Sequence, residues 1–308
     1  MVHTVVARSH ILILTVLYMV SASPVDAQQL EPRTYTNTPV GMNFLIAGYG
    51  YATGSVVSDP SLPLENADID NHELVLGYAR SLDMWGMSGK VDMILPYAWS
   101  SGSAEFAGEF RERRVDGFGD PRLRLSVNFF GAPALSLKDF LTYKQDLLVG
   151  ASLQVGLPMG QYDADRLLNI GTNRWTFRPE LGISKAFGPL TLEVAAGVFL
   201  YTDNTDFLGG NTRKQDPLYE FQAHLIYNMP SGIWLAVDGT YYTGGTTTIA
   251  GVSEGERQDN SRIGLTAAFP IDSHQSLKIF AATGVYARAA GDFDSVGVAW
   301  QYRWGGGL

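Results

Sequence analysis

Ionisable side chains recur at every second position along several extended segments, so that they would share one face of a β-sheet. Both signs of charge occur among them: Arg122, Arg124, Arg178, Glu180, Glu220, His224, Asp238 and Arg262, with Lys90, Asp92, Glu193, Lys278 and Arg288 on the same parity. One interpretation is a set of cross-strand ion pairs that makes a polar interior rigid. The other is a translocation path, in which Arg122, Arg178 and Arg262 attract a carboxylate or phenolate through the planar arginine fork. Glu180 and Glu220 would then bound the constriction.

The same face offers little for catalysis or metal binding. Ser152, His224 and Asp238 are the residue types of a hydrolase triad, but type and parity alone give no geometry. Besides His224, only His72 and His274 follow residue 27, and none of the three has a second histidine or carboxylate at metal-ligand spacing. The chain has no cysteine, which excludes disulfides and thiolate sites. We therefore predict no enzyme activity, no metal and no cofactor, with an outer-membrane hydrolase kept as an alternative.

Strands must position these residues. From Arg122 to Phe130 the chain alternates charged or polar residues with Leu123, Leu125, Val127 and Phe129, a period of two that leaves one apolar face. Such segments of about ten residues, separated by turn residues, are typical of a transmembrane β-barrel. Twelve of them are predicted: Met42–Thr53, His72–Leu82, Gly89–Trp99, Arg122–Gly131, Leu147–Pro158, Trp175–Phe187, Leu192–Tyr201, Tyr219–Asn228, Ile233–Tyr242, Arg262–Phe269, Leu277–Arg288 and Ser295–Trp304. The fold class is thus an all-β, antiparallel, up-and-down barrel.

The N-terminus predicts export. Residues 1–10 include Arg8, Ile11–Val20 is apolar, and Val25-Asp26-Ala27 supplies small residues for cleavage. The apolar run is shorter than the about 20 residues that a membrane-spanning helix needs. We predict a signal peptide over residues 1–27 and a single barrel domain over residues 28–308, located in the outer membrane of a Gram-negative cell.

Connection lengths support the same topology. Short turns are expected at Ala186–Pro189, Asn228–Gly232 and Pro270–His274, and long polar loops at Met159–Arg174, Thr202–Pro217 and Gly244–Asn260. This alternation is typical of tight periplasmic turns and longer extracellular loops, and it places both termini in the periplasm. One short-side connection, Ser136–Asp146, has an N-cap serine and helical apolar spacing, so a small amphipathic helix is expected. A packed connector is the favoured role for it, and a gate is the alternative.

Aromatic residues are abundant, with 15 tyrosines, 15 phenylalanines and 6 tryptophans. Parity places five of them inside the barrel: Phe199, Tyr201, Trp234, Tyr242 and Tyr286. They would offer stacking faces to an aromatic solute or fill volume. The net charge of −9 is spread over many segments, which argues against a nucleic-acid partner.

The last strand carries a specific local pattern. Ser295, Gly297, Trp300 and Tyr302 are similar to the polar-x-Gly-x-x-aromatic-x-aromatic signal that the outer-membrane assembly machinery recognises. The chain runs on beyond Trp304 through three glycines and a leucine. We expect the assembly machinery, outer-membrane lipid and lipopolysaccharide to be partners of the barrel.

The chain resembles the phenol meta-pathway degradation family of outer-membrane transporters. The similar segments are Glu31–Leu45, Gly117–Phe140, Val155–Pro189 and Ser295–Trp304. The resemblance implies a barrel that admits aromatic or other hydrophobic compounds, and it brings no catalytic residues. We therefore predict a channel for passive or facilitated uptake of a small hydrophobic or aromatic solute. The alternative is a structural or adhesion barrel with a filled lumen.

Overall fold

The computed structural model describes residues 31–55, 64–106, 109–166, 168–253, 257–288 and 292–308. The predicted signal peptide, residues 1–27, lies outside the described residues. Within these ranges, no helix has the length and apolar character required to cross a membrane.

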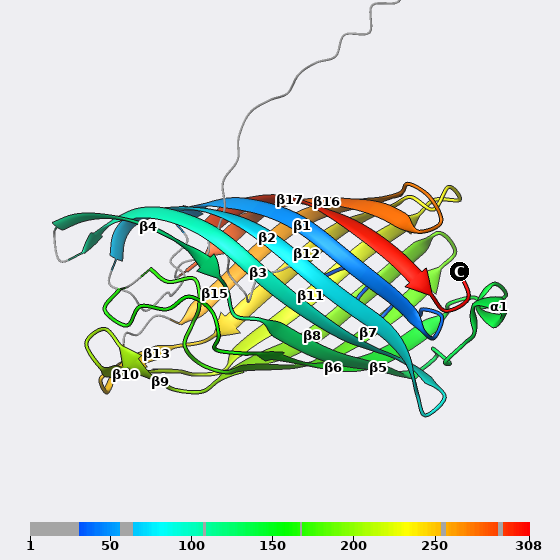
Figure 1. Ribbon diagram of the computed structural model, residues 1–308, viewed down its shortest axis with the longest axis horizontal. Coiled ribbons are helices and arrows are strands. Elements are labelled where there is room, and N and C mark those ends of the chain that lie inside the picture. The colour runs from blue at the N-terminus through cyan, green and yellow to red at the C-terminus, as the bar shows by residue number, and fades with distance from the viewer. Residues whose placement is uncertain (1–30, 56–63, 107–108, 167, 254–256, 289–291) are drawn as a thin grey trace, which may run out of the picture.

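The chain folds into a closed antiparallel barrel with twelve strand positions, as predicted (Figure 1). The wall is built in order from β1 (Met42–Ser55), β2 (Leu64–Met84), β3 (Met87–Phe106), β4 (Glu109–Phe118) with β5 (Arg122–Phe130), β6 (Leu147–Gly156), β7 (Thr176–Phe187), β8 (Leu190–Tyr201), β11 (Leu218–Asn228), β12 (Trp234–Gly244), β15 (Gln258–Pro270), β16 (Gln275–Ala287) and β17 (Asp292–Gly305). Both β4 and β5 pair with β3, one after the other, so together they fill one position. Pairing of β1 with β17 closes the wall.

Side chains alternate between the two faces of the wall. Along β11, Leu218, Glu220, Gln222 and His224 are buried, whereas every intervening residue is exposed, including Phe221. The exposed members are apolar in the middle of the strands, which is what a lipid-facing surface requires. On strands such as β11 the interior face is polar, as the predicted alternation requires.

The two ends of the barrel differ. The C-terminus and α1 (Leu137–Phe140) lie at the end that also holds the short turns (Figure 1). The α1 helix confirms the expected helical segment, and the Ser136 side chain accepts a hydrogen bond from the Asp139 backbone N–H at 3.2 Å. The other end carries the long connections, which include β9 (Asn204–Phe207), β10 (Asn211–Gln215), β13 (Thr247–Ile249) and β14 (Val252–Ser253). By the convention of bacterial barrels, the first end is periplasmic and the second is extracellular.

The turn between β15 and β16 shows how a short periplasmic connection is held. One Asp272 carboxylate oxygen accepts from the backbone N–H groups of His274 and Gln275, at 2.7 and 2.8 Å. The hydrogen bond from His274 lowers the pKa of the Asp272 carboxyl below its ordinary value. Because the folded-state pKa is depressed, the turn gains stability above the ordinary pKa of the carboxyl and loses it as the pH falls.

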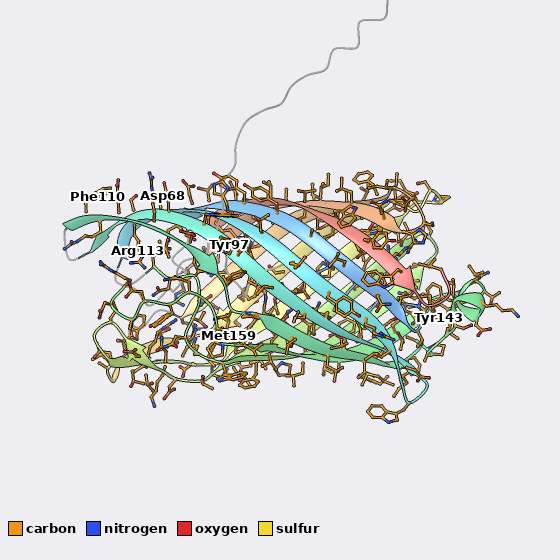
Figure 2. The ribbon with its side chains drawn as sticks, in the orientation of Figure 1. Asp68, Tyr97, Phe110, Arg113, Tyr143 and Met159 are labelled. Carbon is orange, nitrogen blue, oxygen red and sulfur yellow. The ribbon has the colours of Figure 1, made fainter. Side chains whose placement is uncertain are left out.

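Several strands extend beyond the predicted bounds at the extracellular end. The strand predicted over His72–Leu82 begins at Leu64, the next continues to Phe106, and β4 was not predicted at all. Figure 2 shows Asp68, Phe110 and Arg113 on this protruding part, opposite Tyr143 at the periplasmic end. Outside the bilayer neither face meets lipid, so the sequence loses the apolar alternation on which the prediction depended.

Two residues predicted to face the interior, Tyr286 and Arg288, face outward, so these predictions are wrong. Ser261 pairs with Tyr286 but Arg262 pairs with Gly284, so β16 carries one extra residue, Val285, at a β-bulge. Val285 and Tyr286 are both exposed, at 65% and 58%. Beyond the bulge the facing is reversed, and Tyr286 and Arg288 point out of the barrel instead of into it.

Candidate functional site in the barrel lumen

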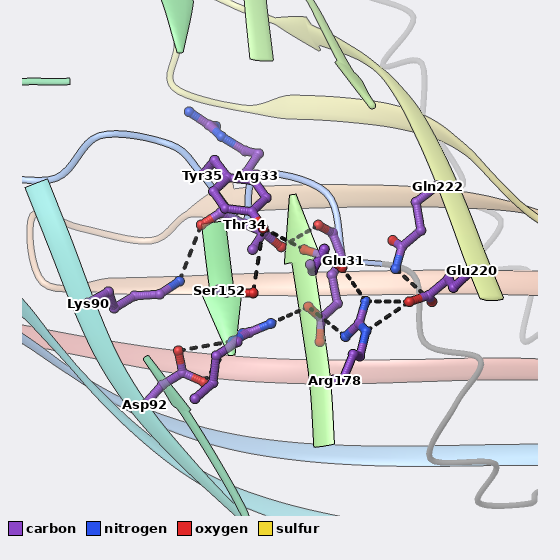
Figure 3. Close-up of polar contacts among 12 residues, drawn as sticks. Glu31, Arg33, Thr34, Tyr35, Lys90, Asp92, Ser152, Arg178, Glu220 and Gln222 are labelled. Atoms are coloured by element: carbon purple, nitrogen blue, oxygen red, sulfur yellow. Dashed lines mark hydrogen bonds and ion pairs between the residues drawn. The ribbon is translucent and has the colours of Figure 1, made fainter. Parts of the chain in front are cut away.

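The N-terminal segment, residues 31–41, enters the barrel and lies against the inner wall (Figure 3). Glu31 pairs with Arg124 on β5 and lies 3.8 Å from Arg178 on β7. The Tyr35 hydroxyl donates to Glu180 at 2.8 Å, and the Asn128 side-chain amide donates to the Tyr35 carbonyl at 3.0 Å. The segment therefore fills the part of the lumen beside β5, β6 and β7.

Two glycines make room for Tyr35. Gly150 on β6 and Gly182 on β7 are direct cross-strand partners. A Cβ atom at Gly182 would lie 2.1 Å from Tyr35 Cε2, and one at Gly150 would lie 2.4 Å from Tyr35 Cδ1. The Tyr35 ring thus packs directly on the backbone of two strands, which only glycine allows at both positions.

Gly182→Ala should expel Tyr35 and loosen the N-terminal segment, because the added methyl group overlaps the ring. Limited proteolysis of the folded barrel in detergent measures this directly, since a released segment is cut faster. Gly50→Ala on β1 is the matched control, because a Cβ there has no neighbouring atom within 4 Å. Equal protection of the segment in both variants would show that Tyr35 does not anchor it.

A buried ion-pair network surrounds the anchored segment. The Arg178 guanidinium lies 2.5 Å from Glu180 and 2.7 Å from Glu220, on β7 and β11. Glu220 also accepts from the Tyr242 hydroxyl and the Gln222 amide, both at 2.8 Å. Buried charges at these distances stabilise the barrel while all of them are paired. Removing one partner leaves the opposite charge buried and unpaired, which is destabilising.

Arg124 joins this network through the N-terminal segment. Its guanidinium bridges Glu31 and Asp92, with 3.1 Å to the latter. Arg124, Arg178, Glu180 and Glu220 are thus brought together as mutually compensating charges. This arrangement matches the cross-strand ion pairs that parity suggested, with Glu31 as a member that no strand pattern could reveal.

His224 and Asp238 form a separate buried pair on β11 and β12. His224 Nδ1 lies 2.7 Å from Asp238, whose other oxygen accepts from the Thr266 hydroxyl at 2.6 Å. The second ring nitrogen, Nε2, lies 3.1 Å from the Gln222 amide oxygen. Ser152 is not part of this group, since its hydroxyl lies 3.5 Å from the Tyr35 hydroxyl. The structure therefore does not assemble the three residues of the hydrolase alternative.

Arg122 and Arg262 are buried as well, and Arg122 is an electrostatic neighbour of Glu31. Arg122 is at the extracellular start of β5. Arg262 on β15 donates to the Phe293 carbonyl at 3.1 Å and stacks over the Phe293 ring at 3.5 Å. Of the arginines predicted to line one path, Arg178 pairs with carboxylates, whereas Arg262 contacts a carbonyl and a ring. In the part of the chain that the structure describes, no group of three histidines or carboxylates could hold a metal ion.

The opposite side of the lumen has a different character. The inward residues of β16, β17, β1 and β2 are mostly small or apolar, and most are only half-buried: Phe44, Ile46, Gly48, Gly50, Val75, Phe280, Ala282, Gly297 and Ala299. Open space beside Gly50 reaches at least 4 Å from its ideal Cβ position. The Phe280 ring lies over Gly297, where a Cβ would come within 2.3 Å of it. The lumen is therefore charged and filled on one side, and apolar and less tightly packed on the other.

One cation belongs to this apolar side. Lys278 on β16 points inward, and Glu31, Asp238 and Arg124 are its electrostatic neighbours. Among the described residues, no carboxylate oxygen lies within 4 Å of its ammonium group. Of the aromatic residues predicted inside, Phe199 and Tyr242 are buried, Tyr201 stacks under Arg174 at 4.2 Å, and Trp234 lies under Arg33 at 5.3 Å.

The chain is similar to known proteins both in sequence and in fold. Residues 67–299 match the family described as "Putative MetA-pathway of phenol degradation". Among solved structures, the COG4313 outer membrane channel from Pseudomonas putida F1 has a TM-score of 0.75 at 18% identity, covering 90% of this chain and 100% of that one. The transport unit of the autotransporter AIDA-I from Escherichia coli has a TM-score of 0.50 at 8% identity, covering 91% and 94%. No curated protein matches the chain.

The family match spans most of the chain, and the structural likeness shows the fold. Together with the closed twelve-strand wall, these two findings identify an outer-membrane β-barrel. The chain belongs to the phenol-degradation family of outer-membrane β-barrels.

Proposed function

We propose that the protein is a channel that admits a small hydrophobic or aromatic solute across the outer membrane, without catalysing a reaction. The observation that carries the proposal is the two-sided lumen. The N-terminal segment occupies the charged side, while β16, β17, β1 and β2 present a half-buried apolar wall. A narrow passage of this composition favours small solutes with an apolar body over sugars or large ions.

The charged residues have a different role in this proposal. Arg124, Arg178, Glu180 and Glu220 neutralise one another and hold the N-terminal segment, so they shape the passage more than they bind the solute. Phe280 offers an aromatic face beside the passage, and Lys278 offers a cation two residues before it on the same face of β16. The P. putida channel, as its name describes it, supports transport as the general activity, and the description of the family supports an aromatic solute.

Ala282→Trp should slow solute entry, because the indole projects into the lumen from the apolar wall. Ala281→Trp on the same strand is the matched control, since Ala281 is exposed on the outer face. The rate of solute entry is measured as the influx of radiolabelled benzoate or catechol into proteoliposomes. We expect faster influx with the wild-type protein than with empty vesicles, a marked loss for Ala282→Trp, and no loss for Ala281→Trp.

A structural barrel with a filled lumen is the second candidate, and the seated N-terminal segment favours it. The same proteoliposomes separate the two functions. Influx through the wild-type protein that is no faster than through empty vesicles would contradict the channel and support a structural role. Equal influx in both tryptophan variants would contradict the passage along β16.

We also propose that β17 is the segment read by the assembly machinery. Trp300 and Tyr302 lie on the outer face of this last strand, with ring centroids 6.1 Å apart, and the Trp300 indole N–H donates to Gln275 at 3.0 Å. Ser295 and Gly297 face inward, where Ser295 accepts from Arg262 at 3.3 Å. These four residues thus also help to close and pack the barrel. This double role supports the proposal that the assembly machinery reads β17 to check that the barrel folds correctly.

A further inference from the structure

The bulge in β16 has a consequence on the outer surface of the barrel. Because Val285 is an extra residue, the end of β16 turns Arg288 outward, where the β15–β16 register brings it beside Asp259. Without the bulge, regular alternation would place Arg288 in the lumen. Bulges are commonly used to re-aim a side chain near a functional site.

Arg288 completes an outward-facing group that we name the outer arginine cluster: Arg257, Arg288, Asp259, Thr243 and Tyr241. The Arg288 and Arg257 guanidinium groups lie 3.3 and 3.7 Å from the same Asp259 oxygen. The other Asp259 oxygen accepts from the Thr243 and Tyr241 hydroxyls, at 2.6 and 3.2 Å. Two positive charges against one negative charge leave one positive charge in the cluster.

Both arginines remain available to a ligand. The side chains of Arg257 and Arg288 are 58% and 60% exposed, whereas that of Asp259 is 19% exposed. The carboxylate thus lies beneath the two guanidinium groups and holds them close together. Arg288 donates one hydrogen bond to Asp259, and Arg257 donates one to Thr243. Each guanidinium group has five N–H donors, so both retain N–H groups for a ligand.

The cluster lies at the depth of the lipid headgroups. The cluster's own Tyr241 begins the next row toward the membrane, where it lies beside Ser261 and Tyr286 on the adjacent strands. Both tyrosines of this row are exposed, and so is Tyr219 on the neighbouring strand. Exposed tyrosines of this kind mark the interface of the bilayer in outer-membrane barrels. Below them the outer face is apolar, with Val237 and Leu265 exposed. The cluster therefore faces the headgroup layer of the outer leaflet.

Three other outward positions near this rim are acidic, although Arg114 shares a face of β4 with one of them, Asp116. Asp116 accepts from Tyr97 at 2.6 Å, Asp294 accepts from Thr283 at 2.6 Å, and Asp70 accepts from Thr53 at 3.2 Å. No arginine or lysine lies within 4 Å of these three carboxylates in the described part of the chain. An anionic headgroup would be repelled there and attracted at the outer arginine cluster.

We propose that the outer arginine cluster binds a phosphate group of the glycolipid in the outer leaflet. Two arginine forks side by side match the oxygen geometry of a phosphate, and the hydroxyls of Tyr241 and Ser261 lie where a sugar headgroup would rest. The apolar surface below the cluster meets the acyl chains of the same lipid. The inference does not depend on the solute or on whether the lumen conducts.

Native mass spectrometry of the purified barrel with added lipid A tests the proposal. We expect the wild-type protein to retain bisphosphorylated lipid A, and the double variant Arg257→Ser with Arg288→Ser to retain it at least tenfold more weakly. The double lysine variant keeps both charges and should recover most of the binding. Dephosphorylated lipid A should bind the wild-type protein as weakly as bisphosphorylated lipid A binds the serine variant.

Two controls keep the result specific. Arg80→Ser removes an exposed arginine from the periplasmic part of β2, so it changes the net charge by one, as each single serine substitution in the cluster does, and it should leave lipid A binding unchanged. Migration of unboiled samples on gels confirms that each variant is folded. Undiminished binding by the folded serine variant, or an equal loss in Arg80→Ser, would overturn the proposal. Phosphatidylglycerol binding as tightly as lipid A would overturn it as well, because that result would show general attraction of anionic lipids.

Discussion

Arg178→Met is expected to lower the free energy of unfolding by about 3–5 kcal/mol, the cost typical of breaking a buried ion pair by removing one partner. The Arg178 guanidinium is 6% exposed and lies between Glu180 and Glu220, which are 4% and 2% exposed. Methionine fills much of the volume but leaves both carboxylates, and Glu31 beside them, without this cation. The barrel would have to protonate a carboxylate or admit water, and either response weakens the fold.

Urea-induced unfolding in lipid vesicles, followed by tryptophan fluorescence, measures the change. Arg166→Met is the matched control, because its side chain is 62% exposed and its nearest carboxylate, Asp163, lies at 3.8 Å. A surface pair of that kind contributes about 1 kcal/mol or less. If the two variants unfold at the same urea concentration, the network around Arg178 does not stabilise the barrel as the geometry indicates.

Removal of residues 31–38 is expected to widen the conducting path while leaving the barrel folded. The wall strands keep their hydrogen bonds to one another, because the deleted residues contact the wall through side chains and single backbone groups and take part in no strand pairing. Arg124 retains Asp92, and Arg178 retains Glu180 and Glu220 as partners. The charged side of the lumen would then fill with water, and larger solutes would enter.

Liposome swelling with sugars of increasing size measures the expected change in cut-off. The shortened protein should admit sugars that the barrel with residues 31–38 in place excludes. A matched variant that replaces Arg33 by serine and retains the other residues of the segment should keep the narrow cut-off. An unchanged cut-off after the deletion would show that the N-terminal segment does not restrict the passage.

The strand positions could be predicted because lipid imposes a period of two on the outer face. The segments from Arg122 to Phe130 and from Leu218 to Asn228 show this most clearly, and the interior position of Glu220 and His224 follows from parity alone. The prediction of Tyr286 and Arg288 failed for the same reason, since parity is lost after one inserted residue. A bulge leaves no composition signal that a single sequence reveals.

The packing of the lumen could not be predicted from the strands. Glu31 and Tyr35 lie in a segment with no alternating pattern, and their partners are more than 90 residues away along the chain. The glycine pair Gly150 and Gly182 was the available signal, because two glycines on adjacent inward positions indicate a close approach by another group. The sequence shows both glycines but does not show that they are cross-strand partners, because that requires the register between β6 and β7.

Single-channel recording in planar bilayers, with the barrel that keeps residues 31–38 and the barrel that lacks them side by side, tests the central claim most directly. A barrel whose lumen is half filled by its own N-terminal segment should give a small but measurable conductance in the full chain and a clearly larger one after the deletion. Equal currents from the two proteins, or none from either, would contradict a passage that the N-terminal segment narrows.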